Sequence, residues 1–271
     1  MFPANAPRYM HISVDDVIEI LRELDLNGYQ SVWDHPIFSM FQRLNQQYGA
    51  VFSLYSFYET NDGLWTLDHM TTQFRDEFRQ ASHWLRFGFH GYSYKSDYGY
   101  SENSIPCQVA KNHYTLVVNA ICKFAGSSAI DTIPRIHFYQ GQRETVRSWK
   151  RNQLGLKGLL SADDGRDEVY YLNRKQREIL ISSDDYYDFD EKLYFIHTDI
   201  RLENELNPAL ALDARLIDPV YKNQQRIQCI FTHEDQLKQE SIRKKIEDCC
   251  RWATAYDFHF LFPMDCLPFQ N

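Results

Sequence analysis

Several features that would narrow the function at once are missing from this chain. There is no basic stripe: 29 Lys and Arg stand against 37 Asp and Glu, and the formal net charge is −8. A nucleic-acid partner is therefore not expected. No apolar run is long enough to span a membrane, and the start of the chain lacks the apolar stretch of a signal peptide. The anionic surface favours a neutral substrate or a bound cation over a polyanionic polymer.

Paired cysteines and linkers are also missing. The chain has no C-x-x-C pair, and most of its cysteines lie in apolar segments, as expected for reduced core thiols of a cytoplasmic protein. No Gly-, Ser- or Pro-rich linker, repeat or low-complexity tract divides the 271 residues, of which 44% are hydrophobic. We therefore predict a cytoplasmic protein with one domain over residues 1–271 and a sizeable core. The oligomeric state has no signature in the sequence.

What the chain does contain is a regular alternation of strand-like and helical segments. The strand-like segments are Tyr9–Val14, Val51–Tyr58, Arg86–His90, Ile133–Tyr139, Leu156–Ala162, Leu193–Leu202 and Arg226–Thr232. The helical patterns are Val17–Leu24, Pro36–Tyr48, Asp68–Leu85, Ser104–Phe124, Glu144–Gln153, Pro208–Tyr221 and Glu234–Ala255. Such alternation predicts an α/β protein with a parallel sheet, either a closed or nearly closed barrel or a doubly wound open sheet. The irregular segment 163–192 is predicted to be a hairpin-like insertion.

Residues that can bind a metal stand at or near the ends of several predicted strands. Asp15 and Asp16 end the first strand, His90 the third and His233 the last, and His137 lies in the fourth. In parallel α/β barrels the chemistry sits at the C-terminal ends of the strands, so these groups should meet at one rim. Two adjacent carboxylates repel each other, and a bound metal ion is the usual compensation, with one carboxylate as ligand and the other as base.

These residues resemble the motifs of the glycoside hydrolase/deacetylase superfamily, in particular the NodB-like polysaccharide deacetylases. Val14-Asp15-Asp16 is similar to a first motif in which one Asp is the base and the next binds the metal. His90 matches the first histidine of a His-x-x-x-His motif, and Tyr94 stands where the second belongs. Arg135–Gly141 is similar to an Arg-x-Pro-x-x-Gly strand end, with His137 near the usual proline, and Ile230–His233 resembles the final motif, whose histidine acts as acid.

The resemblance implies a distorted (β/α)7 barrel, of TIM type, and a metal-dependent carbohydrate deacetylase that removes an acetyl group from an amino sugar or related amide. It implies Asp15 as base, His233 as acid, and a divalent metal, zinc by preference, on Asp16 and His90. We predict His137 as the remaining ligand.

Because Tyr94 replaces a family ligand, the choice of His137 has an alternative in Asp97. Arg135 is expected to keep Asp15 ionised and oriented, although it could pair with another acidic neighbour.

Aromatic residues make up 15% of the chain, which suits a sugar-stacking surface, although a thick core explains this share as well. Trp65, in a loop past the second strand, is the first predicted substrate-binding residue. Tyr92 and Tyr94, in the loop after the third strand, are the others. Loop packing is the alternative for each. The partner predicted from these residues is a carbohydrate or small amide substrate.

Structural roles remain open for the same residues. Asp15 could cap the first helix with Asp16 in its first turn, His90 could be a core histidine, and His233 could cap the last helix. The alternation of side chains puts His197 and Asp199, with Arg201 and Glu203, on one strand face, which either lies near the site or faces solvent.

Two other functions remain open. A metal-independent glycoside hydrolase on the same barrel would use two carboxylates, with Asp15 and Asp163 as candidates. A catalytically inactive barrel that binds a glycan or a protein is the second alternative, and Tyr94 is its main support.

Overall fold

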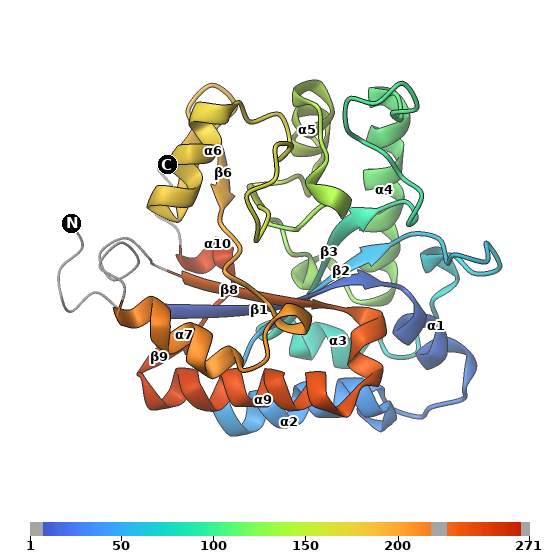
Figure 1. Ribbon diagram of the computed structural model, residues 1–271. Helices are drawn as coiled ribbons and strands as arrows, with labels where there is room; N and C mark the ends of the chain where they lie inside the picture. The colour runs from blue at the N-terminus through green and yellow to red at the C-terminus, as the bar shows by residue number, and fades with distance from the viewer. Residues whose placement is uncertain (1–7, 218–226, 267–271) are drawn as a thin grey trace.

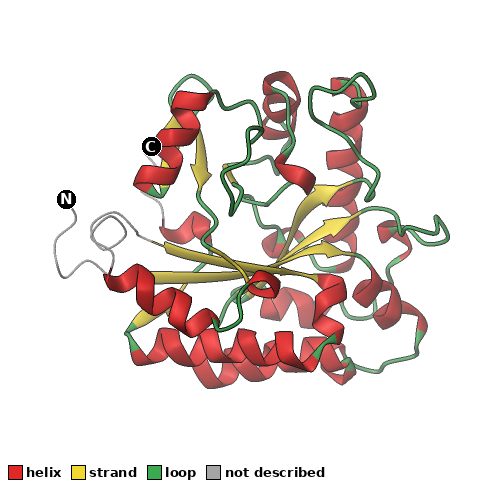
Figure 2. Ribbon diagram, in the orientation of Figure 1, coloured by secondary structure: helices red, strands yellow, loops and turns green. Residues whose placement is uncertain are grey.

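The computed structural model describes residues 8–217 and 227–266, in which strands and helices alternate along the chain (Figures 1 and 2). The main sheet has the spatial order β3 (Leu85–Gly91), β2 (Phe52–Phe57), β1 (Arg8–Val17), β8 (Ile227–His233) and β7 (Ile200–Arg201), with β9 (Phe258–Phe260) beside the start of β1. A smaller sheet has the order β4 (Gly158–Leu160), β6 (Leu193–Ile196) and β5 (Asp185–Asp188). Of these pairs, only β5 with β6 is antiparallel.

Helices surround the strands. They are α1 (Glu19–Leu26), α2 (Pro36–Tyr48), α3 (Arg75–Ala81), α4 (Cys107–Phe124), α5 (Arg143–Lys150), α6 (Arg174–Ser183), α7 (Pro208–Ile217), α9 (Glu240–Ala255) and α10 (Pro263–Cys266). In Figure 1, α2 and α9 lie side by side below β1 and β8, and α4 packs on β3 and α5. Within the described ranges, no helix combines the length and apolar character needed to cross a bilayer.

The two sheets are joined into a distorted barrel by the extended segment 130–136. On one side of this segment, the Asp131 N–H donates to the Phe87 carbonyl of β3 at 2.7 Å. On the other side, the Leu160 N–H of β4 donates to the Pro134 carbonyl at 3.0 Å. After β6 the chain runs through residues 197–199 to β7, which pairs with β8 of the main sheet; β6 and β7 are not paired with each other, so no ladder closes the ring at this point. The predicted α/β fold with parallel strands on a barrel plan is confirmed, although the ladder is interrupted at 130–136.

The prediction of a regular strand over Ile133–Tyr139 is wrong. Pro134 has no N–H to give to a ladder, and the Ile133 N–H donates at 2.9 Å to an aspartate side chain two residues earlier. Phe138 and Tyr139 then take left-handed φ angles of 54° and 59°, which end the extended run in a 3₁₀ turn. Residues of this kind in a left-handed conformation carry strain of about 1–3 kcal/mol each.

Several predicted helices begin later than the sequence pattern indicates. The helices expected from residues 68, 104 and 234 begin at Arg75, Cys107 and Glu240, and 3₁₀ turns precede the first and last of them. The segment 163–192 contains α6, which was not predicted, and β5, which pairs with β6 as a hairpin. The end of the helix expected at 208–221 and the first residue of the strand expected at 226–232 lie outside the described residues.

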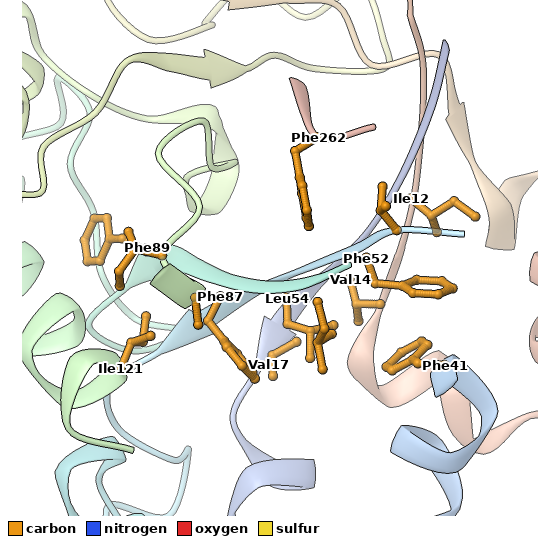
Figure 3. Packing of buried hydrophobic residues seen from close by; sticks show 14 of the residues in the cluster. Ile12, Val14, Val17, Phe41, Phe52, Leu54, Phe87, Phe89, Ile121 and Phe262 are labelled. Atoms are coloured by element: carbon orange, nitrogen blue, oxygen red, sulfur yellow. The ribbon is translucent and has the colours of Figure 1, made fainter. Parts of the chain in front are cut away.

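The apolar core lies between the main sheet and its covering helices. Val14, Phe52 and Leu54 point from β1 and β2 toward α2, where the ring centroid of Phe41 is 4.6 Å from that of Phe52 (Figure 3). Phe262 lies on the opposite side of these strands (Figure 3). Because both faces are covered, these strands are rich in apolar residues.

The inward face of β1 is polar. His11, Ser13 and Asp15 alternate with core residues, so they point to the other side of the strand, and all three are buried. His11 Nε2 lies 2.8 Å from the Ser53 hydroxyl of β2, inside the barrel. The alternation therefore delivers Asp15 to the carboxyl end of the strand on the interior side.

Gly88 marks a place where the barrel has no room for a side chain. An added Cβ would lie 2.9 Å from Tyr55 Cδ1 and 3.1 Å from Pro134 Cβ. We expect Gly88→Ala to lower the free energy of unfolding by about 1–3 kcal/mol, because overpacking displaces both neighbours. Urea denaturation measures this change. The control is Gly165→Ala, at an exposed glycine with no heavy atom within 4 Å of an added Cβ; a loss as large as that of Gly88→Ala would contradict the packing argument.

Candidate metal centre and its surroundings

Three side chains predicted as metal ligands meet at the carboxyl end of the strands. Asp16 comes from β1, His90 from β3 and His137 from the 3₁₀ turn after segment 130–136. One ligand atom from each lies within 4.8 Å of the others. His90 and His137 are buried, and Asp16 is partly buried. Parallel strands that end at one rim account for this meeting of residues far apart in the sequence.

Backbone carbonyls fix which ring nitrogens carry protons. His90 Nδ1 lies 2.7 Å from the Arg135 carbonyl oxygen and donates to it, and His137 Nε2 donates to the Tyr94 carbonyl at 3.1 Å. The remaining nitrogens, His90 Nε2 and His137 Nδ1, then carry lone pairs and lie 3.3 Å apart. Histidine ligands of metals commonly donate their other N–H in this way, which orients the ring.

Asp16 adds a third acceptor to these two nitrogens. Its Oδ1 lies 2.9 Å from His90 Nε2 and 3.5 Å from His137 Nδ1. This oxygen is buried without a hydrogen bond among the described residues. Three lone-pair atoms in mutual contact repel one another unless a proton or a metal ion lies between them. Ligand atoms of a tetrahedral zinc site, with bonds of about 2.0–2.1 Å, stand about 3.3 Å apart, so this set fits a divalent ion.

The protonation states also suit metal binding. Burial opposes ionisation of Asp16, but in the metal-free site a protonated His137 or His90 can donate to this carboxyl, which outweighs burial and lowers its pKa. Burial lowers the pKa of His137 and so favours its neutral form. Metal ligands must be in these deprotonated states. Asp16 also has a left-handed φ of 62°, a strained conformation at a candidate ligand.

Asp15 is held by a buried arginine. The Arg135 guanidinium donates to Asp15 Oδ1 at 2.8 Å, to the Ser13 hydroxyl at 3.0 Å and to the Thr198 hydroxyl at 2.9 Å. Burial alone would lower the pKa of Arg135, but the Asp15 carboxylate outweighs it and raises that pKa. The alternative in which Asp15 caps the first helix is wrong, because α1 begins only at Glu19.

His233 forms a pair with Glu203. Its Nδ1 donates to Glu203 Oε1, and the Thr232 hydroxyl donates to the other carboxylate oxygen at 2.9 Å. Burial disfavours the charged imidazole, but the hydrogen bond to Glu203 prevails and raises the pKa of His233. The alternative role of His233 as a helix cap is wrong, since its side chain makes no capping hydrogen bond.

A cavity of about 520 Å³ joins these groups. Asp15, Asp16, His90, Arg135, His137 and His233 all line it. At its mouth stand two half-exposed aromatic residues, Tyr94 at 50% and Phe138 at 51%, whose ring centroids are 5.0 Å and 4.0 Å from that of His137. Arg166 and Arg201 complete the wall, and each pairs with an aspartate, Asp164 at 2.6 Å and Asp163 at 2.8 Å respectively.

Two predicted substrate-binding residues lie elsewhere. Trp65 is only 4% exposed and donates from Nε1 to Asp25 at 3.1 Å, because its loop folds back on the core; the predicted sugar platform at Trp65 is wrong. The Tyr92 ring packs against His113 with centroids 4.4 Å apart and is not among the residues that line the cavity, as the alternative of loop packing expects; its substrate-binding role stays a prediction.

The alternative ligand Asp97 does not reach the centre either. It accepts from the Gly99 N–H at 2.8 Å and from the Ser101 hydroxyl at 2.5 Å, within its own loop.

The strand face that carries Arg201 and Glu203 lies at the site, through their partners Asp163 and His233. Asp199 lies apart from the cavity: it forms a second acidic cluster with Asp184 and His197, and Arg215 donates to it at 2.7 Å. The sequence pattern is compatible both with a position near the site and with a position facing solvent.

Sequence reasoning missed Phe138 and Glu234 altogether. Phe138 stands directly after a proposed ligand, and Glu234 directly after the proposed acid. Adjacency to a candidate residue at a strand end was the only available signal for either.

Neither protein-family models nor curated protein sequences match this chain. Solved structures do. The match covers 96% of this chain and 89% of a probable polysaccharide deacetylase from Pseudomonas aeruginosa PAO1, with a TM-score of 0.56 and 10% identity. It covers 96% and 89% for the Xyl-CE4 domain of a xylanase from the hindgut metagenome of Trinervitermes trinervoides, with a TM-score of 0.52 and 9% identity.

A third match is the family 4 acetyl xylan esterase from Clostridium thermocellum, solved in complex with a cobalt ion. It covers 96% of this chain and 90% of that one, with a TM-score of 0.50 and 11% identity. At such identities the likeness shows a shared fold. The chain therefore has the fold of the polysaccharide deacetylases, which confirms at the level of fold the resemblance carried by its motifs.

The Glu203–His233 pair predicts a pH-dependent contribution to stability. Because the folded pKa of His233 is raised above 6.5, its contribution is complete below pH 6.5 and is lost as the pH rises through the raised value. We expect Glu203→Gln to lower the pKa of His233, as measured by NMR titration of its ring protons in metal-free protein. Glu205→Gln removes the same charge two residues away, and a shift of equal size there would contradict the assigned pairing.

Proposed function

We propose that this protein is a metal-dependent carbohydrate deacetylase that hydrolyses the acetyl group of an N-acetyl amino sugar or a related amide. The observation that carries the proposal is the meeting of Asp16 Oδ1, His90 Nε2 and His137 Nδ1, three acceptors without a proton between them. Zinc is the proposed ion, because a few His and carboxylate ligands with one open position form its usual catalytic site. The shared deacetylase fold supports the same chemistry.

The proposed reaction divides between the ion and the protein. Asp16, His90 and His137 would hold the ion, which supplies a Lewis acid for the acyl carbonyl and makes a water molecule more acidic. Asp15 accepts the proton of the attacking water. Arg135 holds Asp15 in place through a contact of 2.8 Å, so the carboxylate can act as a base without rearrangement.

His233 provides the proton for the leaving amine. Its Nδ1–H is occupied by Glu203, so the proton to be transferred is on Nε2. The raised pKa of His233 extends upward the pH range over which this proton is held. Asp15 and His233 are register partners on the adjacent strands β1 and β8, which puts base and acid beside each other at the cavity. A base and an acid on neighbouring strands suit a hydrolysis in which water loses a proton and nitrogen gains one.

The cavity walls suit a sugar ring. Tyr94 and Phe138 offer exposed aromatic surface at its mouth, on which the apolar face of a pyranose can stack. The Arg201–Asp163 pair offers charged donors and acceptors for hydroxyl groups on another wall.

The metal-independent glycoside hydrolase is less well supported. Asp15 and Asp163, its candidate carboxylates, each contact an arginine at 2.8 Å. The guanidinium in each pair offers only N–H donors, so the carboxyl oxygen that faces it cannot carry the proton of a glycosidase's general acid. The inactive barrel loses its main support as well, because His137 supplies the nitrogen that Tyr94 does not.

Removal of a ligand should abolish metal binding. We expect purified wild-type protein loaded with zinc to hold about one equivalent after dialysis. Asp16→Ala and His137→Ala should hold almost none by elemental analysis, because two donors remain for a small ion. His259→Gln, at an exposed histidine, is the control and should retain the wild-type amount. Stoichiometric zinc in both ligand variants would rule out this ligand set.

Loss of the base or the acid should reduce turnover without loss of the ion. We expect Asp15→Asn and His233→Asn to retain zinc and to lower kcat by about 10²–10⁴-fold in the release of acetate from N-acetylglucosamine oligomers. His259→Gln is again the control. Release of the aglycone from an aryl glycoside by chelator-treated protein would favour the glycoside hydrolase, and glycan binding without either reaction would favour the inactive barrel.

A further inference from the structure

Glu234 makes an unusual contact with the main chain at the start of α1. Its Oε1 accepts from the Ile18 N–H at 3.0 Å and from the Ile20 N–H at 2.9 Å. Its Oε2 accepts from the Glu19 N–H at 3.0 Å. Glu234 follows directly after His233 at the end of β8, so the contact joins residues more than 200 positions apart. The carboxylate is 6% exposed.

The start of α1 needs such a partner. The first N–H groups of a helix have no acceptor within the helix, and the residue at its N-cap, Ile18, has no side-chain oxygen to offer. A carboxylate satisfies these donors and also interacts favourably with the positive end of the helix dipole. Among the described residues, no basic side chain forms an ion pair with Glu234. The main-chain N–H groups are therefore what opposes its burial, although burial prevails and raises the pKa of this carboxyl to about 8.

Glu234 binds the main chain just after the irregular turn that carries Asp16, the proposed metal ligand. Asp16 has a left-handed φ of 62°, and the pairing of β1 with β2 shifts register between Val14 and Val17. Before this irregular turn, the β1 ladder fixes the chain. After it, Val17 pairs again with Ser56 of β2, and the main chain that follows is attached to the end of β8 by the bonds to Glu234. The position of the Asp16 carboxylate thus depends on both ends of the turn.

We propose that Glu234 is a positioning residue that clamps the Asp16 turn to the end of β8, and so holds the ligand Asp16 in register with the acid His233. This inference rests on the proposed function, because it takes Asp16 as a metal ligand. The carboxylate acts through the main chain at 18–20 and needs no contact with substrate or ion.

Glu234→Gln tests the clamp with the smallest change of shape. Its amide oxygen can still accept N–H groups, but its NH₂ group faces a main-chain donor where Glu234 Oε2 accepted one. We expect amide hydrogen exchange at Ile18, Glu19 and Ile20 to become at least about tenfold faster in metal-free protein. We expect the Kd for Co²⁺ to rise about 10–100-fold, as for other groups that orient metal ligands, with a changed visible absorption spectrum of the bound cobalt.

The matched control is Asp235→Asn, which makes the same change from carboxyl to amide at the next, exposed residue. It should leave both the exchange rates and the cobalt spectrum as in wild type. Glu234→Asp keeps the carboxyl group but shortens the side chain, and it should give a smaller loss in the same direction. This variant also decides the matter if Glu234→Gln does not fold.

The outcomes separate the two proposals. Wild-type protein that binds no cobalt would overturn the proposed function, and the exchange rates would still decide whether Glu234 holds the turn. Cobalt binding by wild type, with unchanged exchange, Kd and spectrum in the Glu234 variants, would overturn the clamp and leave the proposed function standing.

Discussion

The site depends on the burial of one guanidinium group, that of Arg135. Transfer of an ion from water into a protein interior costs several kcal/mol, and the attraction of a partner offsets this only with good geometry and further hydrogen bonds. Arg135 has both: Asp15 neutralises it, and the Ser13 and Thr198 hydroxyls take two more of its donors. Its face lies over the Phe231 ring, 4.1 Å from the centroid. The same residue holds His90 through its carbonyl oxygen. One residue therefore fixes the proposed base by its side chain and orients a proposed ligand by its main chain.

The break in the barrel is part of the same arrangement. In a regular fourth strand the Arg135 carbonyl would bond to a neighbouring strand. The side chain of residue 137 would then lie on the same face of the sheet as that of Arg135. Because the chain leaves the ladder at Pro134, the carbonyl is available to His90, and the following turn brings His137 to the rim. The left-handed residues Phe138 and Tyr139 complete this turn. Strain of this kind persists where surrounding contacts impose it, and here the imposed conformation sets one proposed ligand and one wall of the cavity.

Features that depend on the local sequence pattern were predicted correctly. Features whose conformation or contacts depend on residues far away in the chain were not. Alternating segments predicted a parallel α/β sheet, and the resemblance of the motifs favoured the barrel over the open sheet. Because parallel strands end at one rim, Asp16, His90 and His137 could be placed together without coordinates. Their roles stay a proposal. The strand at 133–139 was wrong because hydrophobic pattern does not reveal a proline and an aspartate that divert the ladder. Trp65 was wrong because the burial of a loop depends on how it folds back. The partners of His233 and of the α1 terminus, Glu203 and Glu234, come from far along the chain, and pairing at such range leaves no mark in local spacing.

The imidazoles of the site are oriented by peptide carbonyls, at Arg135 and Tyr94, and this has a consequence for divergence among related chains. Every amino acid supplies a carbonyl oxygen. The residue at position 94 can therefore be substituted without loss of the hydrogen bond to His137, provided that the loop keeps its path. The geometry of the centre then depends on the path of the backbone, and that path can be kept while many side chains around it change.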